Sequence, residues 1–172
     1  MADHVDGILS QWAAERPDLD VSAMAVLGRL ARAARLADAR LGVTFAAHGL
    51  DAASFDVLAT LRRSGEPFRL TPTEIQQSAM VTSSAIAQRL NRLERDGLVL
   101  RGPNAADGRG TVVTLTREGR AVIDRALPDH VATEQRMLAG LTGVQRADLA
   151  TLLRALTESV AETTATATAS RP

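Results

Sequence analysis

The segment from Leu70 to Arg120 constrains the fold more tightly than any other part of the chain. It contains two short stretches with helical signals, one that starts at Thr71 and one that runs to Arg95, separated by a tight turn. Two β-prone runs follow directly, Leu98–Leu100 and Thr111–Leu115, and a polar loop with Pro, Asn, Asp and Gly joins them. Two short helices followed by a two-stranded hairpin predict a winged helix-turn-helix.

Apolar residues at helical spacing predict longer helices on both sides of this segment. Ser22 is a plausible N-cap for a long helix that Gly49 closes, and Asp51 is expected to cap the next helix. The last residues, Thr163 to Pro172, alternate Thr, Ala and Ser without an apolar face, which predicts disorder. The helices expected outside the winged segment cover about residues 5–15, 22–48, 51–61, 116–141 and 143–162. The fold class is therefore mainly α with a small β-hairpin.

The composition excludes several classes of function. The chain has 0 Cys, so it has no disulfide, thiol redox sensor, cysteine nucleophile or thiolate metal site. Its 3 His residues lack metal-binding spacing and no nucleotide-binding or hydrolase motif is present, so we expect no metal, no cofactor and no enzymatic activity. It also lacks a long apolar run and the pattern of a signal peptide, so we expect a cytoplasmic protein.

Charge is distributed unevenly along the chain, although the formal net charge is +0. Arg89 to Arg120 contains seven arginines and four carboxylates, whereas Met1 to Asp20 contains one arginine and five carboxylates. All 20 basic residues are Arg, the side chain best suited to phosphate and guanine. Because the basic segment coincides with the helix-turn-helix, the sequence predicts binding of double-stranded DNA.

The second helix of the helix-turn-helix carries small or polar side chains at its N-terminal end, which suits entry into a major groove. Ile86, Leu90 and Leu93, with Leu98, form a separate apolar stripe. At the wing tip, a flexible loop is expected to place an Arg in the minor groove, where an Asp two residues earlier orients it. Taken alone, this pattern is also consistent with an ordinary amphipathic helix that is capped by serines. The wing that follows it favours the interpretation as a DNA-binding helix. The expected DNA contacts are Thr82, Ser83, Ser84, Ala87, Gln88, Arg92, Asp107 and Arg109.

These motifs together resemble the MarR family of bacterial transcription regulators. The resemblance covers nearly the whole chain and includes the run Leu93 to Val99, the Asp107-x-Arg109 wing and the run Val113 to Gly119. It implies a homodimer that binds a palindromic operator through two recognition helices about 34–36 Å apart. In this chain it assigns residues 1–21 to an extra helix and linker, 22–48 with 120–162 to dimerisation helices, 49–119 to the DNA-binding lobe and 163–172 to a disordered tail.

The added first helix, which carries the only Trp of the chain, is similar to the branch of this family that responds to urate and related anions. This resemblance implies a ligand site made of Trp12, Asp56, Arg89 and Arg101. Trp12 would stack on a flat heterocycle, one Arg would pair with its anionic oxygens, and Asp56 would bond to the ring or be displaced by its charge.

Each of these four side chains also has an ordinary structural interpretation. Trp12 would then be a packing anchor, and Arg101 a phosphate contact. Asp56 would pair with a neighbour such as Arg62 or Arg63. Arg89 would face DNA only.

The sequence therefore predicts a ligand-responsive, homodimeric transcription regulator. Its simplest mode of action is repression, with release of DNA when a small aromatic or purine anion such as urate binds. The alternative is a winged-helix protein-interaction module that does not bind DNA.

Overall fold

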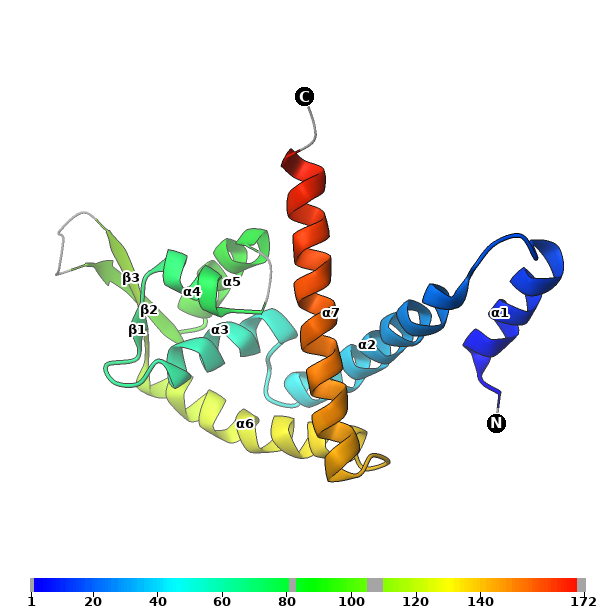
Figure 1. The fold of residues 1–172 in the computed structure, drawn as a ribbon. Helices are drawn as coiled ribbons and strands as arrows, with labels where there is room; N and C mark the ends of the chain where they lie inside the picture. The colour runs from blue at the N-terminus through cyan, green and yellow to red at the C-terminus, as the bar shows by residue number, and fades with distance from the viewer. Residues whose placement is uncertain (1, 81–82, 105–109, 170–172) are drawn as a thin grey trace. The chain divides into compact units, whose positions relative to one another are not determined.

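The computed structural model describes residues 2–80, 83–104 and 110–169, with side chains for all of these except 83–85 and 164–169. The chain divides into two compact units, residues 1–133 and 134–172, which are described separately below. Figure 1 shows the elements in chain order. The helices are α1 (His4–Glu15), α2 (Ser22–Ala46), α3 (Ala52–Arg63), α4 (Pro72–Ser78), α5 (Ser83–Arg95), α6 (Arg117–Met137) and α7 (Gly143–Ala169), and the strands are β1 (Arg69–Leu70), β2 (Val99–Pro103) and β3 (Thr111–Leu115).

Side-chain caps begin the helices around the predicted winged segment. Asp51 caps α3 as predicted, because its carboxylate accepts the backbone N–H of Ser54 at 2.9 Å. Thr71 and Glu74 form a reciprocal capping box at the start of α4, where Pro72 occupies the first turn. These local signals explain why the positions of both helices were predictable.

Helix α2 differs from the prediction at both ends. Its N-cap is Val21, which makes no side-chain cap, and Ser22 lies inside the helix with its N–H donated to Asp20 Oδ1 at 2.9 Å. The helix ends at Ala46, before His48, and Gly49 follows with a φ of 71°. The side chain of Asp20 therefore takes the capping role that the sequence analysis assigns to Ser22.

The wing is part of a three-stranded antiparallel sheet with the order β1-β3-β2, not a hairpin alone. Strands β2 and β3 pair with Arg101 opposite Val113, and Leu70 of β1 pairs with Val113 from the other side. Strand β1 spans only two residues, which is too short for an alternating pattern to be recognised in the sequence.

One core joins α3, α4, α5, the sheet and the start of α6. The apolar stripe of α5 is buried as predicted, with Ile86, Leu90 and Leu93 between 1% and 4% exposed, whereas Leu98 is only partly buried. At Gly119, an added Cβ would lie 2.0 Å from the backbone oxygen of Leu98. This close approach between α6 and the residues before β2 requires glycine.

Helix α7 extends beyond the end that its apolar periodicity predicts. The sequence predicts disorder from Thr163 onward, whereas the structure continues the helix to Ala169. Alanine is the best helix former and recurs through this segment, so the helix is able to propagate without an apolar face.

Large apolar side chains are exposed on two of the long helices. On α2 they are Met24, Val26, Leu27, Leu30, Leu36 and Val43, and on α7 they are Val144, Leu149, Leu152, Leu153 and Val160. Several large apolar side chains exposed along one helix are typical of an interaction surface. Among the described residues, none of the helices combines the length and the apolar character needed to cross a membrane.

Candidate functional site

Helix α5 presents one apolar face and one polar face. Its apolar stripe is buried in the core, and Ala87 and Gln88 are exposed on the other side, together with Arg92. Asn91 and Arg95 are also exposed, at helical spacing from Gln88, and extend the same polar face. The contact set predicted from the sequence does not include these two residues, although their i+3 and i+7 spacing from Gln88 places them on the same side of the helix.

Several expected DNA contacts cannot be placed. Thr82, Asp107 and Arg109 lie outside the described residues, and Ser83 and Ser84 belong to the first turn of α5 without described side chains. Their expected roles stay predictions from sequence.

Asp51 connects α5 to the N-terminus of α3. Its Oδ2 lies 2.8 Å from Arg89 Nη1 and 3.2 Å from Arg92 Nη1. Arg92 also faces Asp96 at 3.6 Å, one turn later on the same helix. The carboxylate that caps α3 is therefore also the ion-pair partner of two arginines on α5, a role that no local pattern in the sequence indicates.

Asp56 and Arg63, both on α3, hold the segment that leads into α5. Asp56 Oδ2 accepts the backbone N–H of Met80 at 2.6 Å, and Arg63 Nη2 donates to the backbone oxygen of Ser78. The alternative partner, Arg62, pairs instead with Asp124 of α6, at 2.7 Å between Nε and Oδ1. An anion that displaced Asp56 would thus free the backbone amide of Met80, close to the start of α5.

Asp56 also lines a cavity of about 440 Å³. Its apolar wall includes Phe55, Ile123 and Leu127, and its charged groups include Arg62 and Arg63. An apolar wall with a few convergent charged groups is typical of sites for small organic ligands.

Arg101 lies on β2 and lines a different cavity, of about 370 Å³, together with Gln76 and Asn91. Its backbone N–H donates to Glu94 Oε1 at 3.2 Å, and its Nε lies 3.7 Å from Glu94 Oε2. Arg101 is therefore tied to the end of α5, as Arg89 is tied to the start of α3.

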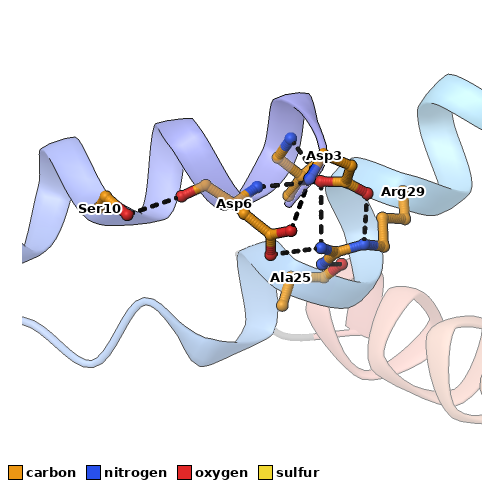
Figure 2. A network of polar contacts seen from close by, with 6 residues as sticks. Asp3, Asp6, Ser10, Ala25 and Arg29 are labelled. Carbon is orange, nitrogen blue, oxygen red and sulfur yellow. Dashed lines mark hydrogen bonds and ion pairs between the residues drawn. The ribbon is translucent and has the colours of Figure 1, made fainter. Parts of the chain in front are cut away.

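Trp12 lies on α1 and is 40% exposed. Figure 2 shows how this helix is attached to α2 through Arg29, whose guanidinium reaches the two carboxylates at the start of α1. The distances are 2.9 Å from Nε to Asp3 Oδ2 and 2.6 Å from Nη2 to Asp6 Oδ1. Val5, which lies between the two carboxylates in the chain, is 5% exposed and packs against Gly28, where an added Cβ would lie 3.4 Å from a methyl group of Val5.

The four expected ligand residues therefore occupy separate surroundings in this structure. Asp56 and Arg101 line different cavities, Arg89 pairs with Asp51, and Trp12 lies on α1. A shared ligand would have to engage side chains that now have partners of their own.

Both carboxyls of the Arg29 network have a pKa below their ordinary value of 3.8. The pKa of Asp3 is lowered first by the N–H of Asp6 and then by Arg29, and the pKa of Asp6 first by the N–H of Asp3 and then by Arg29. Because the pKa is lower in the folded state, the ionised carboxyls stabilise the first turn of α1 through the capping box and, through Arg29, its docking on α2. This contribution is present above pH 3.8 and is lost as the pH falls through the lowered values.

We therefore expect acid to release α1 from α2. Trp12 fluorescence, followed from about pH 6 to pH 2, should show a transition that a D3N/D6N double variant lacks, because that variant is already released at neutral pH. Far-UV circular dichroism in parallel identifies any global unfolding. Asp38→Asn, an exposed carboxyl of α2 outside the network, is the control and should titrate like the unmodified chain. Identical curves for the double variant and the unmodified chain would contradict the assignment.

Comparisons with family models, curated relatives and solved structures all find transcription regulators of one family. The family model described as MarR family matches residues 48–110. The chain is 40% identical over 149 residues to the transcriptional regulator PecS of Dickeya dadantii, covering 87% of this chain and 90% of PecS.

Two solved structures are similar over most of both chains. Sco3205 of Streptomyces coelicolor, a MarR family regulator in complex with DNA, has a TM-score of 0.74 and 28% identity and covers 83% of this chain and 93% of its own. BpsR of Bordetella bronchiseptica, whose DNA binding is regulated by 6-hydroxynicotinic acid, has a TM-score of 0.70 and 27% identity, with coverage of 77% and 92%.

Proposed function

Because the chain belongs to the MarR family of DNA-binding transcription regulators, we propose that it works as a homodimeric repressor that releases a palindromic operator when a small aromatic or purine anion binds. Members of this family are transcription regulators and not enzymes. The observation that carries the proposal is α5, which buries an apolar stripe and turns a polar face to solvent. The major groove of B-DNA is wide enough to admit a helix with such an exposed polar face.

The proposed DNA contacts combine two grooves. The exposed face of α5, with Ala87, Gln88 and Arg92, reads the major groove together with Thr82, Ser83 and Ser84 at its start. Arg109, oriented by Asp107, enters the minor groove at the wing. The likeness to a family member in complex with DNA supports this use of the lobe.

The exposed apolar side chains of α2 and α7 support the homodimer. They are too many to be left in water by a stable monomer, and a second copy offers the same side chains in return. A two-fold axis would place two α5 helices on successive turns of a palindromic operator.

The proposed ligand is a planar anion such as urate, held by Trp12, Asp56, Arg89 and Arg101. BpsR, whose DNA binding responds to an aromatic carboxylic acid, supports this class of effector. Asp51 and Glu94 now pair with the two arginines, so the ligand anion would compete with these carboxylates. Ligand binding would then weaken the contacts that hold α5 and shift it from its DNA-binding position.

A titration with fluorescent DNA tests the proposal. Labelled duplex from upstream of the protein's own gene should bind with an affinity in the nanomolar range at physiological salt, and unrelated duplex about 10³-fold more weakly. Urate or 6-hydroxynicotinate should then release the operator. Failure to bind either duplex would favour the alternative of a winged-helix module for protein contacts, and equal binding to both would refute a specific operator. Retained operator binding at millimolar concentrations of both compounds would refute the ligand class.

The salt dependence of binding tests the wing. Arg109→Ala should reduce the slope of log K against log salt concentration by about 0.9 for each phosphate that the variant no longer neutralises, or about 1.8 for a dimer with two wings. Arg16→Ala removes an equal charge outside the DNA-binding lobe and serves as the control, with an unchanged slope. If both variants gave the same slope as the unmodified chain, Arg109 would have no role in DNA binding.

A further inference from the structure

Asp51 holds the middle of α5 against the start of α3. Its Oδ1 accepts the N–H of Ser54 at 2.9 Å, which leaves Oδ2 for Arg89 at 2.8 Å and Arg92 at 3.2 Å. The side chains of Asp51 and Arg89 are 34% and 33% exposed, so water screens this pair less than a pair on the open surface. The carboxylate is therefore a tether for the proposed recognition helix.

The guanidinium of Arg89 is only partly satisfied by this contact. Its Nη1 faces Asp51, whereas its Nε is buried and has no hydrogen-bond partner within the described part of the chain. A buried donor without an acceptor costs free energy. Guanidinium groups bind most strongly to anions that accept from two N–H groups at once. Arg89 thus has unused capacity for an anion with two adjacent acceptor atoms.

We propose that Asp51 is an internal competitor of the ligand, occupying in the free protein the guanidinium that the ligand anion takes in the bound state. This inference rests on the proposed place of Arg89 in the ligand site. Once the side chain of Arg89 leaves Asp51 and its Nε is uncovered, a planar anion with two adjacent acceptors satisfies both Nε and an Nη, whereas Asp51 Oδ2 contacts Nη1 alone. When the anion binds, α5 keeps only its Arg92 contact to Asp51 and is held less firmly against α3. The affinity for the ligand is therefore set by the difference between the free energy of the ligand's interaction with Arg89 and that of Asp51's interaction with Arg89.

Asp51→Asn separates the charge of this residue from its capping role. Asparagine caps helices as well as aspartate does, so α3 keeps its cap while Arg89 loses its competing anion. Calorimetric titration of urate into the DNA-free protein should show a dissociation constant about fivefold lower than in the unmodified chain. Asp96→Asn removes the other carboxylate beside Arg92 and should leave this constant within about twofold of the unmodified value.

The R89Q background distinguishes competition from simple anchoring. If Asp51 only anchored α5, D51N would also raise urate affinity by easing the shift of α5, but it would do so in the R89Q background as well, where Arg92 still pairs with Asp51. An unchanged or raised dissociation constant in a folded D51N protein overturns the proposal. In an R89Q background, D51N should have no further effect on urate binding, because the contested guanidinium is gone; a full effect there would also overturn it.

The result also separates this inference from the proposed function. If neither urate nor 6-hydroxynicotinate binds the unmodified protein, the proposed ligand class fails and the competitor role fails with it. If the unmodified protein binds urate and D51N binds it equally well, only the competitor role fails.

Discussion

Gly119→Ala is expected to destabilise the DNA-binding lobe by about 3 kcal/mol, the upper end of the usual cost of overpacking. The added Cβ would lie 2.0 Å from the backbone oxygen of Leu98 and 3.0 Å from a methyl group of Leu115. The Leu98 backbone cannot move away easily. Its N–H donates to Leu93 O at 2.8 Å, and its oxygen accepts the N–H of Thr116 at 3.1 Å.

Urea denaturation at one fixed protein concentration measures this destabilisation, because the stability of a dimer depends on concentration. Operator affinity at 25 °C should fall in parallel, since the clash displaces the junction between α5 and β2. Gly7→Ala is the matched control: Gly7 is also helical, and an added Cβ there meets no atom within 4 Å. We expect that variant to be unchanged or slightly more stable. Equal stability of the two variants would mean that the backbone at Leu98 yields without cost.

Leu152→Glu is expected to convert the proposed dimer into a monomer. Leu152 is 68% exposed on α7 and belongs to the apolar stripe with Leu149 and Val160. Burying a leucine contributes about 1.5–3 kcal/mol to the free energy of association. Because each subunit of a two-fold dimer carries the substitution, this contribution is lost twice. A monomer contacts only half of a palindromic operator, so affinity should fall by at least about 10²-fold.

Light scattering after gel filtration gives the mass of each variant, and anisotropy with labelled operator gives the affinity. Thr151→Glu places the same charge on the opposite face of α7 and should leave both the mass and the affinity unchanged. A Leu152→Glu protein that remained dimeric and kept its operator affinity would exclude the α7 stripe from the interface.

Much of the lobe was predictable because its signals are local. The cap at Asp51, the helix start at Thr71 and the apolar stripe of α5 depend on signals over three or four residues, and all three predictions are confirmed. Strand β1 was missed because two residues carry no period, and its pairing depends on β3, far away in the chain. The cap of α2 was assigned to Ser22, whereas Asp20 accepts the N–H of that serine.

The candidate site was less predictable than the fold. Trp12, Asp56, Arg89 and Arg101 were selected by resemblance, and their role as a ligand set stays a prediction. The structure adds the partner of each of the three charged side chains: Met80 N–H for Asp56, Asp51 for Arg89 and Glu94 for Arg101. Those partners are what suggest how a ligand would act on α5, and no spacing in the sequence indicates them.

By itself, the sequence determined where most helices lie, which face of α5 is apolar and where the basic segment falls. Only the tertiary structure decided which charges meet. Arg29 pairs with Asp3 across 26 residues, Arg92 with Asp51 across 41 and Arg62 with Asp124 across 62. The physical reason is that helix signals act between neighbours in the chain, whereas ion pairing depends on distance in space, and among 20 arginines and 20 carboxylates only the packed fold selects the partners.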